Sequence, residues 1–176
     1  SKLKDYYIGK HGISDADWDA HVAAQLALKE RNGAVHEAAA VAAARRYGAV
    51  LASHDDTEAD HVTRSAEHGA HFAEFPTTVE AARACRDHKI KVMMGAPNLI
   101  RGGSHSGNVA AEDLARADLL DIVSSDYVPS SLLSAALRLG DLWGNLARGI
   151  ATVTAAPAKA AGLDDRGHLE PGARAD

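Results

Sequence analysis

Cysteine, proline and aromatic side chains are scarce in this 176-residue chain. Cys85 is the only cysteine, there are five prolines, and aromatic residues make up 5%. A single cysteine excludes an internal disulfide and fits a reducing compartment. There is no signal peptide and no long apolar run, so we expect a cytoplasmic protein that does not enter a membrane. The net charge of −5 argues against extensive nucleic-acid binding, but it permits a local basic site for an anionic small molecule.

Several common active-site motifs are missing as well. The sequence has no glycine-rich phosphate fingerprint of the P-loop or Rossmann type, and no CxxC, HExxH or GxSxG motif. The chain is nevertheless long enough for one domain with its own core, and 46% of its residues are apolar, many of them alanine. Alanine favours helix and allows helices to approach a sheet closely.

Short apolar strands alternate with helices along most of the chain. Residues 1–48 are expected to be helical in two segments, which separate at Asn32–Gly33 and end at Gly48. A long polar, glycine-rich loop is expected after Met94. The expected strands are 49–52, 71–73, 90–94 and 120–123, with helices at 57–68, 78–88 and 111–117 and further helices from Pro129. This alternation predicts parallel βα units, which fit half of a (β/α)8 barrel or a small doubly wound sheet.

Polar residues follow each of the four expected strands, and they help to choose between these two folds. A (β/α)8 barrel carries its chemistry at the carboxyl ends of its strands, whereas a doubly wound sheet concentrates its site at one switch point. Four polar strand ends therefore favour an α/β chain that forms half of a barrel. The four segments are 53–56, 74–77, 95–98 and 124–126.

Three of these strand-end residues can act on a metal ion or its water. His54 can bind a divalent metal, with Asp55 or Asp56 orienting its ring, or it can cap the next helix. Asp126 can bind metal and accept a proton from metal-bound water, or it can be the N-cap of the helix near residue 129. Glu74 can be a ligand, a base or an acceptor for a ribose hydroxyl, or it can pair with a nearby cation.

The segment 101–108 combines glycine with an arginine and several hydrogen-bonding side chains. Its glycines let backbone N–H groups approach an anion, and Arg101 offers a two-pronged contact for phosphate. His105 adds a proton donor or a ligand. The alternative is a flexible surface loop, which has little need for such side chains among glycines. The candidate substrate-binding residues here are Arg101, Gly102, Gly103, Ser104, Ser106 and Asn108.

Taken together, these segments resemble the phosphonate-pathway diphosphatases of the amidohydrolase superfamily. The resemblance extends from Asp5 to Asp176, and the glycine-rich segment is its most specific part. It implies a (β/α)8 barrel with divalent metal, zinc by expectation, at the carboxyl end of the strands. The segments that carry it are 51–56, 73–78, 94–98, 101–108 and 124–127.

The resemblance also implies a place for each strand in the barrel. If Asp126 is the aspartate that follows strand eight, the chain holds strands five to eight, and His54 matches the metal-binding histidine of strand five. Glu74 stands near the position where strand six often brings a second histidine, which departs from the usual two-metal pattern. We therefore expect residues 1–176 to be part of a hydrolase barrel whose first half, with its other ligands, and whose β-sandwich lie outside this sequence.

The reaction implied by the resemblance is metal-dependent hydrolysis of a ribose 1-methylphosphonate 5-triphosphate to the 5-phosphate and pyrophosphate. His54 and Asp126 are the expected metal ligands, and Asp126 and His105 the expected catalytic residues. Arg101, its glycine-rich neighbours and Glu74 are expected to bind the substrate, and a homo-oligomer is compatible with the sequence. Two alternatives remain: a cyclic amidohydrolase or deacetylase of the same superfamily, and a non-catalytic half-barrel that serves as a binding module.

Overall fold

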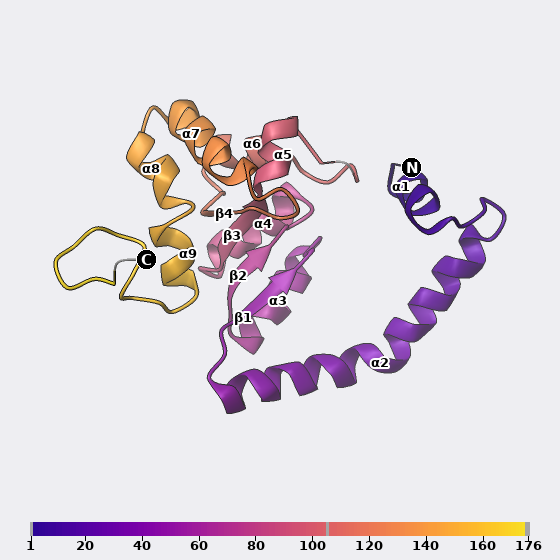
Figure 1. Cartoon of the computed structure of the whole chain (residues 1–176). Helices are drawn as coiled ribbons and strands as arrows, with labels where there is room; N and C mark the ends of the chain where they lie inside the picture. Colours follow the sequence, from indigo (N-terminus) through magenta and orange to yellow (C-terminus); the bar gives the residue numbers. More distant parts are fainter. Residues whose placement is uncertain (1, 105, 175–176) are drawn as a thin grey trace. The chain divides into compact units, whose positions relative to one another are not determined.

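The computed structural model describes residues 2–104 and 106–174 (Figure 1). Its internal contacts divide the chain into two compact units. Of the described residues, the first comprises 2–49 together with 106–107, and the second comprises 50–104 and 108–174. Within the described residues, no helix is both long and apolar enough to cross a membrane.

The first unit consists of two helices. Helix α1 spans Lys2–His11, and α2 is a single helix of 30 residues, Trp18–Tyr47. The predicted separation at Asn32–Gly33 is therefore wrong, because a glycine costs a helix only about 1 kcal/mol relative to alanine and the alanine-rich flanks offset that cost. The predicted end of the helix is confirmed: Gly48 takes a left-handed conformation with φ 63°, and its N–H donates to the carbonyl of Ala44.

The second unit is built on a four-stranded parallel sheet. Its strands are β1 (Leu51–His54), β2 (Ala70–Glu74), β3 (Lys91–Gly95) and β4 (Ile122–Ser124), and they lie in the order β1-β2-β3-β4. A doubly wound sheet reverses its strand order at a switch point, whereas successive strands of a barrel wall follow one another in one direction. The observed order confirms the predicted α/β class and favours the half-barrel over the doubly wound sheet.

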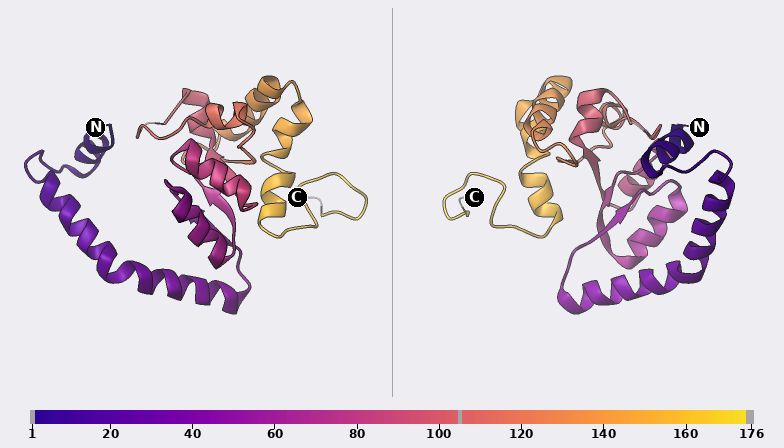
Figure 2. Two further views of the ribbon diagram at one scale, coloured as in Figure 1. Left: turned by 180° about the vertical axis from the view of Figure 1, so that it is seen from behind. Right: turned by 45° about the vertical axis from the view of Figure 1, so that its right-hand side comes forward.

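Helices follow the strands and cover one side of the sheet with a largely aliphatic core. Helices α3 and α4 lie on the same side of the strands in both views (Figures 1 and 2). The core includes Val62, Cys85, Val92, Leu114 and Leu139, which come from five different elements. The helices of this unit are α3 (Ala59–His68), α4 (Val79–Asp87), α5 (Ala96–Arg101), α6 (Ala111–Arg116), α7 (Ser131–Trp143), α8 (Leu146–Ala151) and α9 (Ala155–Ala160).

Helix α5 replaces the first part of the loop that was expected after β3. Pro97 lies in its first turn, where a missing backbone N–H costs the helix nothing. Gly102 ends the helix in a left-handed conformation with φ 79°. The prediction of a continuous loop was therefore wrong for residues 96–101, and Arg101 is the last residue of a helix.

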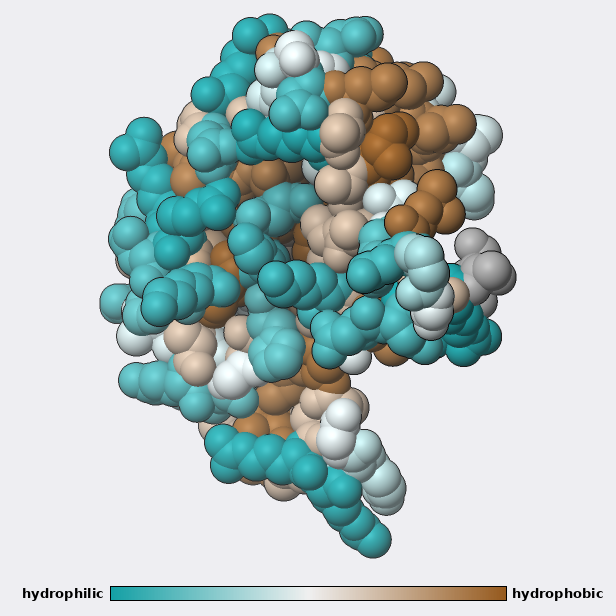
Figure 3. Space-filling model, turned by 90° about the vertical axis from the view of Figure 1, so that its left-hand side faces the viewer, coloured by the Kyte–Doolittle hydropathy of each residue, from teal (hydrophilic) through white to brown (hydrophobic). Residues whose placement is uncertain are grey.

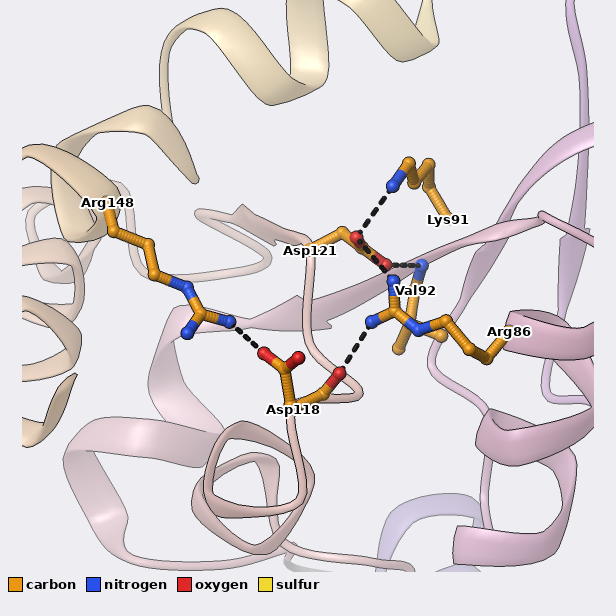
Figure 4. Close-up of polar contacts among 6 residues, drawn as sticks. All are labelled: Arg86, Lys91, Val92, Asp118, Asp121 and Arg148. Atoms are coloured by element: carbon orange, nitrogen blue, oxygen red, sulfur yellow. Dashed lines mark hydrogen bonds and ion pairs between the residues drawn. The ribbon is translucent and has the colours of Figure 1, made fainter.

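A polar network ties the amino-terminal ends of the strands together (Figure 4). Asp121 immediately precedes β4, and its side chain is only 13% exposed. Its carboxylate accepts hydrogen bonds from Lys91 Nζ at 2.9 Å, from the backbone N–H of Val92 at 3.0 Å and from Arg86 Nη1 at 3.4 Å. These contacts join the start of β4 to β3 and to α4, at the end of the sheet opposite the polar strand ends.

Most of the face shown in Figure 3 is hydrophilic, but apolar residues gather in its upper part. Three leucines of the last helices are well exposed: Leu133 and Leu137 in α7, and Leu146 in α8. Leu133 and Leu137 are four residues apart, so they lie on the same side of α7.

Candidate functional site

Three of the four strands are followed by a residue with an unusual backbone conformation. Asp55 after β1, Phe75 after β2 and Asp126 after β4 have φ values of 60°, 57° and 50°. A left-handed conformation costs a residue with a side chain roughly 1–2 kcal/mol, and such strain gathers at functional sites. Three such residues lie at the carboxyl edge of the sheet, where the sequence predicts the site, and two more, Lys89 and Asp118, precede β3 and β4 at the opposite edge.

The side chain of His54 lies between two carboxylates at this edge. Its Nδ1 is 3.0 Å from Asp55 Oδ2, and its Nε2 is 3.9 Å from Glu74 Oε2. His54 and Glu74 are register partners in β1 and β2, and the ring of Phe75 packs edge-on against the imidazole at 5.3 Å between centroids. Asp55 therefore orients the ring and leaves Nε2 directed toward Glu74. Asp56 bonds instead to the hydroxyl of Ser53.

The carboxylate of Asp126 lies against the carboxyl end of β3. A Cβ atom placed on Gly95 would be 2.9 Å from Asp126 Oδ2, so the carboxylate occupies the space where residue 95 would carry a side chain. Asp126 lies in an exposed turn, and the N-cap of α7 is Ser130. The alternative interpretation of Asp126 as a helix cap is therefore wrong.

Arg101 reaches the same turn from the end of α5. Its Nη1 donates to the hydroxyl of Tyr127 at 3.4 Å, next to Asp126 in the chain. The N–H groups of Gly102 and Gly103 both donate to the carbonyl of Asn98, at 3.1 and 2.9 Å. The backbone N–H groups of Gly102 and Gly103 are thus used to end α5. The guanidinium of Arg101, an exposed residue, is therefore the group here that can meet an anion from solvent.

The remaining residues of the predicted anion-binding segment are less informative. His105 lies outside the described residues. Ser104 and Ser106 are half-buried and each makes a polar or ring contact, and Asn108 is exposed. Sequence reasoning gave no role to Asn98, whose Oδ1 accepts from the N–H of Ala111 at 2.9 Å and so fixes the start of α6. No sequence signal pointed to that contact, because its partner lies 13 residues away.

The predicted residues form two groups along one edge. His54 and Glu74 are neighbours on β1 and β2, and Asp126 lies with Gly95 and Arg101 near β3 and β4. Two strands separate β1 from β4, so the structure does not bring His54 and Asp126 into contact. In the part of the chain that the structure describes, no three His, Cys, Asp or Glu side chains are close enough together to hold a metal ion.

His54 and Glu74 present two donor atoms side by side at this edge. Two ligands on one tetrahedral zinc ion are about 3.4 Å apart, given bond lengths of about 2.0–2.2 Å. The 3.9 Å between His54 Nε2 and Glu74 Oε2 approaches that separation, and the contact of Nδ1 with Asp55 is the usual support of a metal-binding histidine. Near Asp126, the hydroxyl of Ser124 is shielded from solvent and has no hydrogen-bond partner among the described residues.

Comparison with known proteins identifies a relative. The chain is 48% identical over 178 residues to alpha-D-ribose 1-methylphosphonate 5-triphosphate diphosphatase of Escherichia coli strain K12. The alignment covers 99% of this chain and 47% of that protein, so the chain spans about half the length of its curated relative. The resemblance predicted from the sequence segments is confirmed. No protein-family model matches the chain.

The fold also has a counterpart among solved structures. The crystal structure of an uncharacterized protein superposes with a TM-score of 0.58 at 20% sequence identity. The match covers 77% of this chain and 40% of that one. It supports the α/β arrangement and, at this level of identity, concerns the fold alone.

Proposed function

We propose that this chain is the C-terminal half of a metal-dependent hydrolase that converts α-D-ribose 1-methylphosphonate 5-triphosphate to the 5-phosphate and pyrophosphate. The observation that carries the proposal is the 48% identity to the curated diphosphatase across nearly the whole chain. Because the chain spans about half of that relative, we place the first barrel half and its metal ligands in sequence outside these residues. This chain supplies half of the active site, and that half lies at the carboxyl edge of the sheet.

His54 and Asp126, which are not in contact within this chain, would each supply one ligand to a divalent ion, zinc by our proposal. When bound, such an ion lowers the pKa of a coordinated water and draws charge from a phosphoryl oxygen. Asp55 holds the His54 ring so that Nε2 faces the site, as the 3.0 Å contact at Nδ1 requires. The neighbouring Glu74 is a further ligand or an acceptor for a ribose hydroxyl.

The proton of the attacking water goes to the carboxylate of Asp126. The exposed position of this carboxylate at the strand edge suits that role, and it is not used as a helix cap. Water attacks phosphorus, the bond to the bridging oxygen breaks, and pyrophosphate leaves. His105 is the proposed donor to the leaving group.

Arg101 neutralises phosphate or phosphonate charge next to this carboxylate. The guanidinium reaches the turn that carries Asp126 through its contact with Tyr127, so it stands beside the reacting group. A charged hydrogen bond to phosphate contributes roughly 1.5–3 kcal/mol. We propose that Ser104 and Asn108 complete the anion site after the substrate enters, since the N–H groups of Gly102 and Gly103 are engaged in closing α5.

Substrate choice and metal content test this function. The full-length protein, loaded with zinc, is assayed against nucleoside triphosphates as surrogates and against cyclic amides and N-acetylated amines. We expect pyrophosphate release from the triphosphates that stops after chelation. Turnover of the amides alone would favour a cyclic amidohydrolase or deacetylase, and a purified protein that retains no metal and turns over nothing would favour a binding module.

Two further expectations belong to the proposal. A cytoplasmic location remains a prediction, based on the cysteine content and the phosphorylated substrate. A homo-oligomer also remains a prediction, and the exposed Leu133 and Leu137 of α7 are a surface that a subunit contact would cover. Light scattering of the full-length protein measures the oligomeric state.

A further inference from the structure

Gly95 is the last residue of β3, and its backbone does not require glycine. Its φ and ψ angles are −77° and 134°, an extended conformation that any residue adopts. It is also the N-cap of α5, yet serine, asparagine or aspartate would cap at least as well and would add a side-chain hydrogen bond. Neither the strand nor the helix therefore explains why a glycine stands here.

The space around Gly95 gives the explanation. A Cβ atom on this residue would lie 2.9 Å from Oδ2, 3.3 Å from Cβ and 3.5 Å from Cγ of Asp126. Side-chain carbons do not approach other atoms closer than 3.0 Å in real proteins. These three nearest atoms all belong to Asp126, so the side chain of Asp126 fills the space that a Cβ atom on residue 95 would take.

We propose that Gly95 is a positioning residue: the absence of its side chain seats the carboxylate of Asp126 over the end of β3. The inference rests on the function proposed for Asp126. It concerns how this chain holds the carboxylate, and it does not depend on which metal or substrate binds there.

The backbone of Asp126 turns its side chain toward this seat. Its φ of 50° is a left-handed conformation, which costs free energy in a residue other than glycine. Ser124 is the register partner of Gly95 in β4, and its hydroxyl is shielded from solvent. A strained turn on one side and an open glycine on the other thus direct the carboxylate back toward the sheet.

A methyl group at position 95 would displace the carboxylate. Moving Oδ2 from 2.9 Å to an ordinary contact of 3.4 Å requires a shift of about 0.5 Å, and a shift of about 1 Å in a reacting group can cost about 100-fold in rate. We therefore expect Gly95→Ala to lower kcat by about tenfold while KM stays within about threefold, because the anion-binding Arg101 is not moved. A substitution that merely reduced the folded fraction would also lower the apparent kcat without changing KM, so kcat is first normalised to the folded fraction measured by circular dichroism.

A double-mutant cycle tests the contact itself, without recourse to activity. Asp126→Gly removes the carboxylate and fits the left-handed backbone. In the full-length protein, Gly95→Ala should be more destabilising, by urea midpoint, when Asp126 is present than in the Asp126→Gly background. In that background the added methyl group meets no carboxylate, and the lower entropy of the unfolded chain should raise the midpoint slightly. Gly33→Ala in α2 is the control, because its added carbon would make only an ordinary 3.6 Å contact with Lys29, and it should alter neither kcat nor the coupling.

Each outcome bears on the inference. If Gly95→Ala fails to fold, recovery of folding in the Asp126→Gly background supports the contact, and no recovery refutes it. Equal losses of stability in both backgrounds, or a Gly95→Ala enzyme with wild-type kcat, would overturn the role of Gly95. If the wild-type protein has no diphosphatase activity, the proposed function fails, while the stability cycle still decides whether Gly95 seats Asp126.

Discussion

Replacement of Asp121 by alanine should destabilise the protein by about 2–4 kcal/mol. The largest part comes from the hydrogen bond that the carboxylate accepts from the backbone N–H of Val92, a residue that is 1% exposed. A bond of this kind contributes about 1.5–3 kcal/mol, and its loss leaves a buried donor without a partner. The ion pairs with Lys91 and Arg86 add at most about 1 kcal/mol each, because those side chains are 51% and 44% exposed.

Asp118 provides a matched control in the same network (Figure 4). Its carboxylate is 76% exposed and pairs with Arg148, while its backbone carbonyl accepts a hydrogen bond from Arg86. Asp118→Asn keeps that carbonyl and tolerates the left-handed φ of 57°, so it should cost less than about 1 kcal/mol.

Urea denaturation followed by circular dichroism measures both variants in the full-length protein. The difference in unfolding free energy between Asp121→Ala and Asp118→Asn should persist in 1 M salt, because salt weakens the exposed ion pairs far more than the buried hydrogen bond. A cost for Asp121→Ala no larger than that of Asp118→Asn would refute this account of how the strands are joined.

Three shorter predictions concern the site and the core. Arg101→Ala should raise KM for a triphosphate roughly tenfold or more, in steady-state kinetics, with little change in the melting temperature. Unchanged kinetics with a lower melting temperature would make Arg101 a structural residue. Asp126→Asn should lower pyrophosphate release by at least about 10²–10⁴-fold with the fold intact, and wild-type release would remove Asp126 from the mechanism. Burial raises the pKa of the Cys85 thiol to about 12, so a thiol reagent at pH 8 should react only after denaturation, whereas rapid labelling of the native protein would contradict this burial.

The alternation of strands and helices was predictable because it rests on local patterns. Four apolar runs bounded by polar residues and glycine predicted four strands, and all four exist with boundaries shifted by one or two residues. The continuity of α2 through Asn32 and Gly33 was not predictable from the same rules. A glycine lowers the stability of a helix by about 1 kcal/mol relative to alanine, and in α2 the helix-favouring residues on both sides outweigh that cost.

The site was predictable only in part. Polar strand ends pointed to the carboxyl edge of the sheet, and the order of the strands brings His54 beside Glu74 there. The seat of Asp126 on Gly95 could not be predicted, because it joins residues 31 positions apart through the register of β3 and β4 and a strained turn. Tertiary contacts of this kind leave no periodic signal in the sequence.

The most direct test of the central claim is to incubate the zinc-loaded full-length protein with α-D-ribose 1-methylphosphonate 5-triphosphate and to follow the products by phosphorus NMR. The account predicts one equivalent of pyrophosphate and one of the 5-phosphate for each substrate consumed, with the reaction abolished by chelation and by Asp126→Asn. An unchanged substrate, or hydrolysis that continues undiminished in the Asp126→Asn variant, would contradict it.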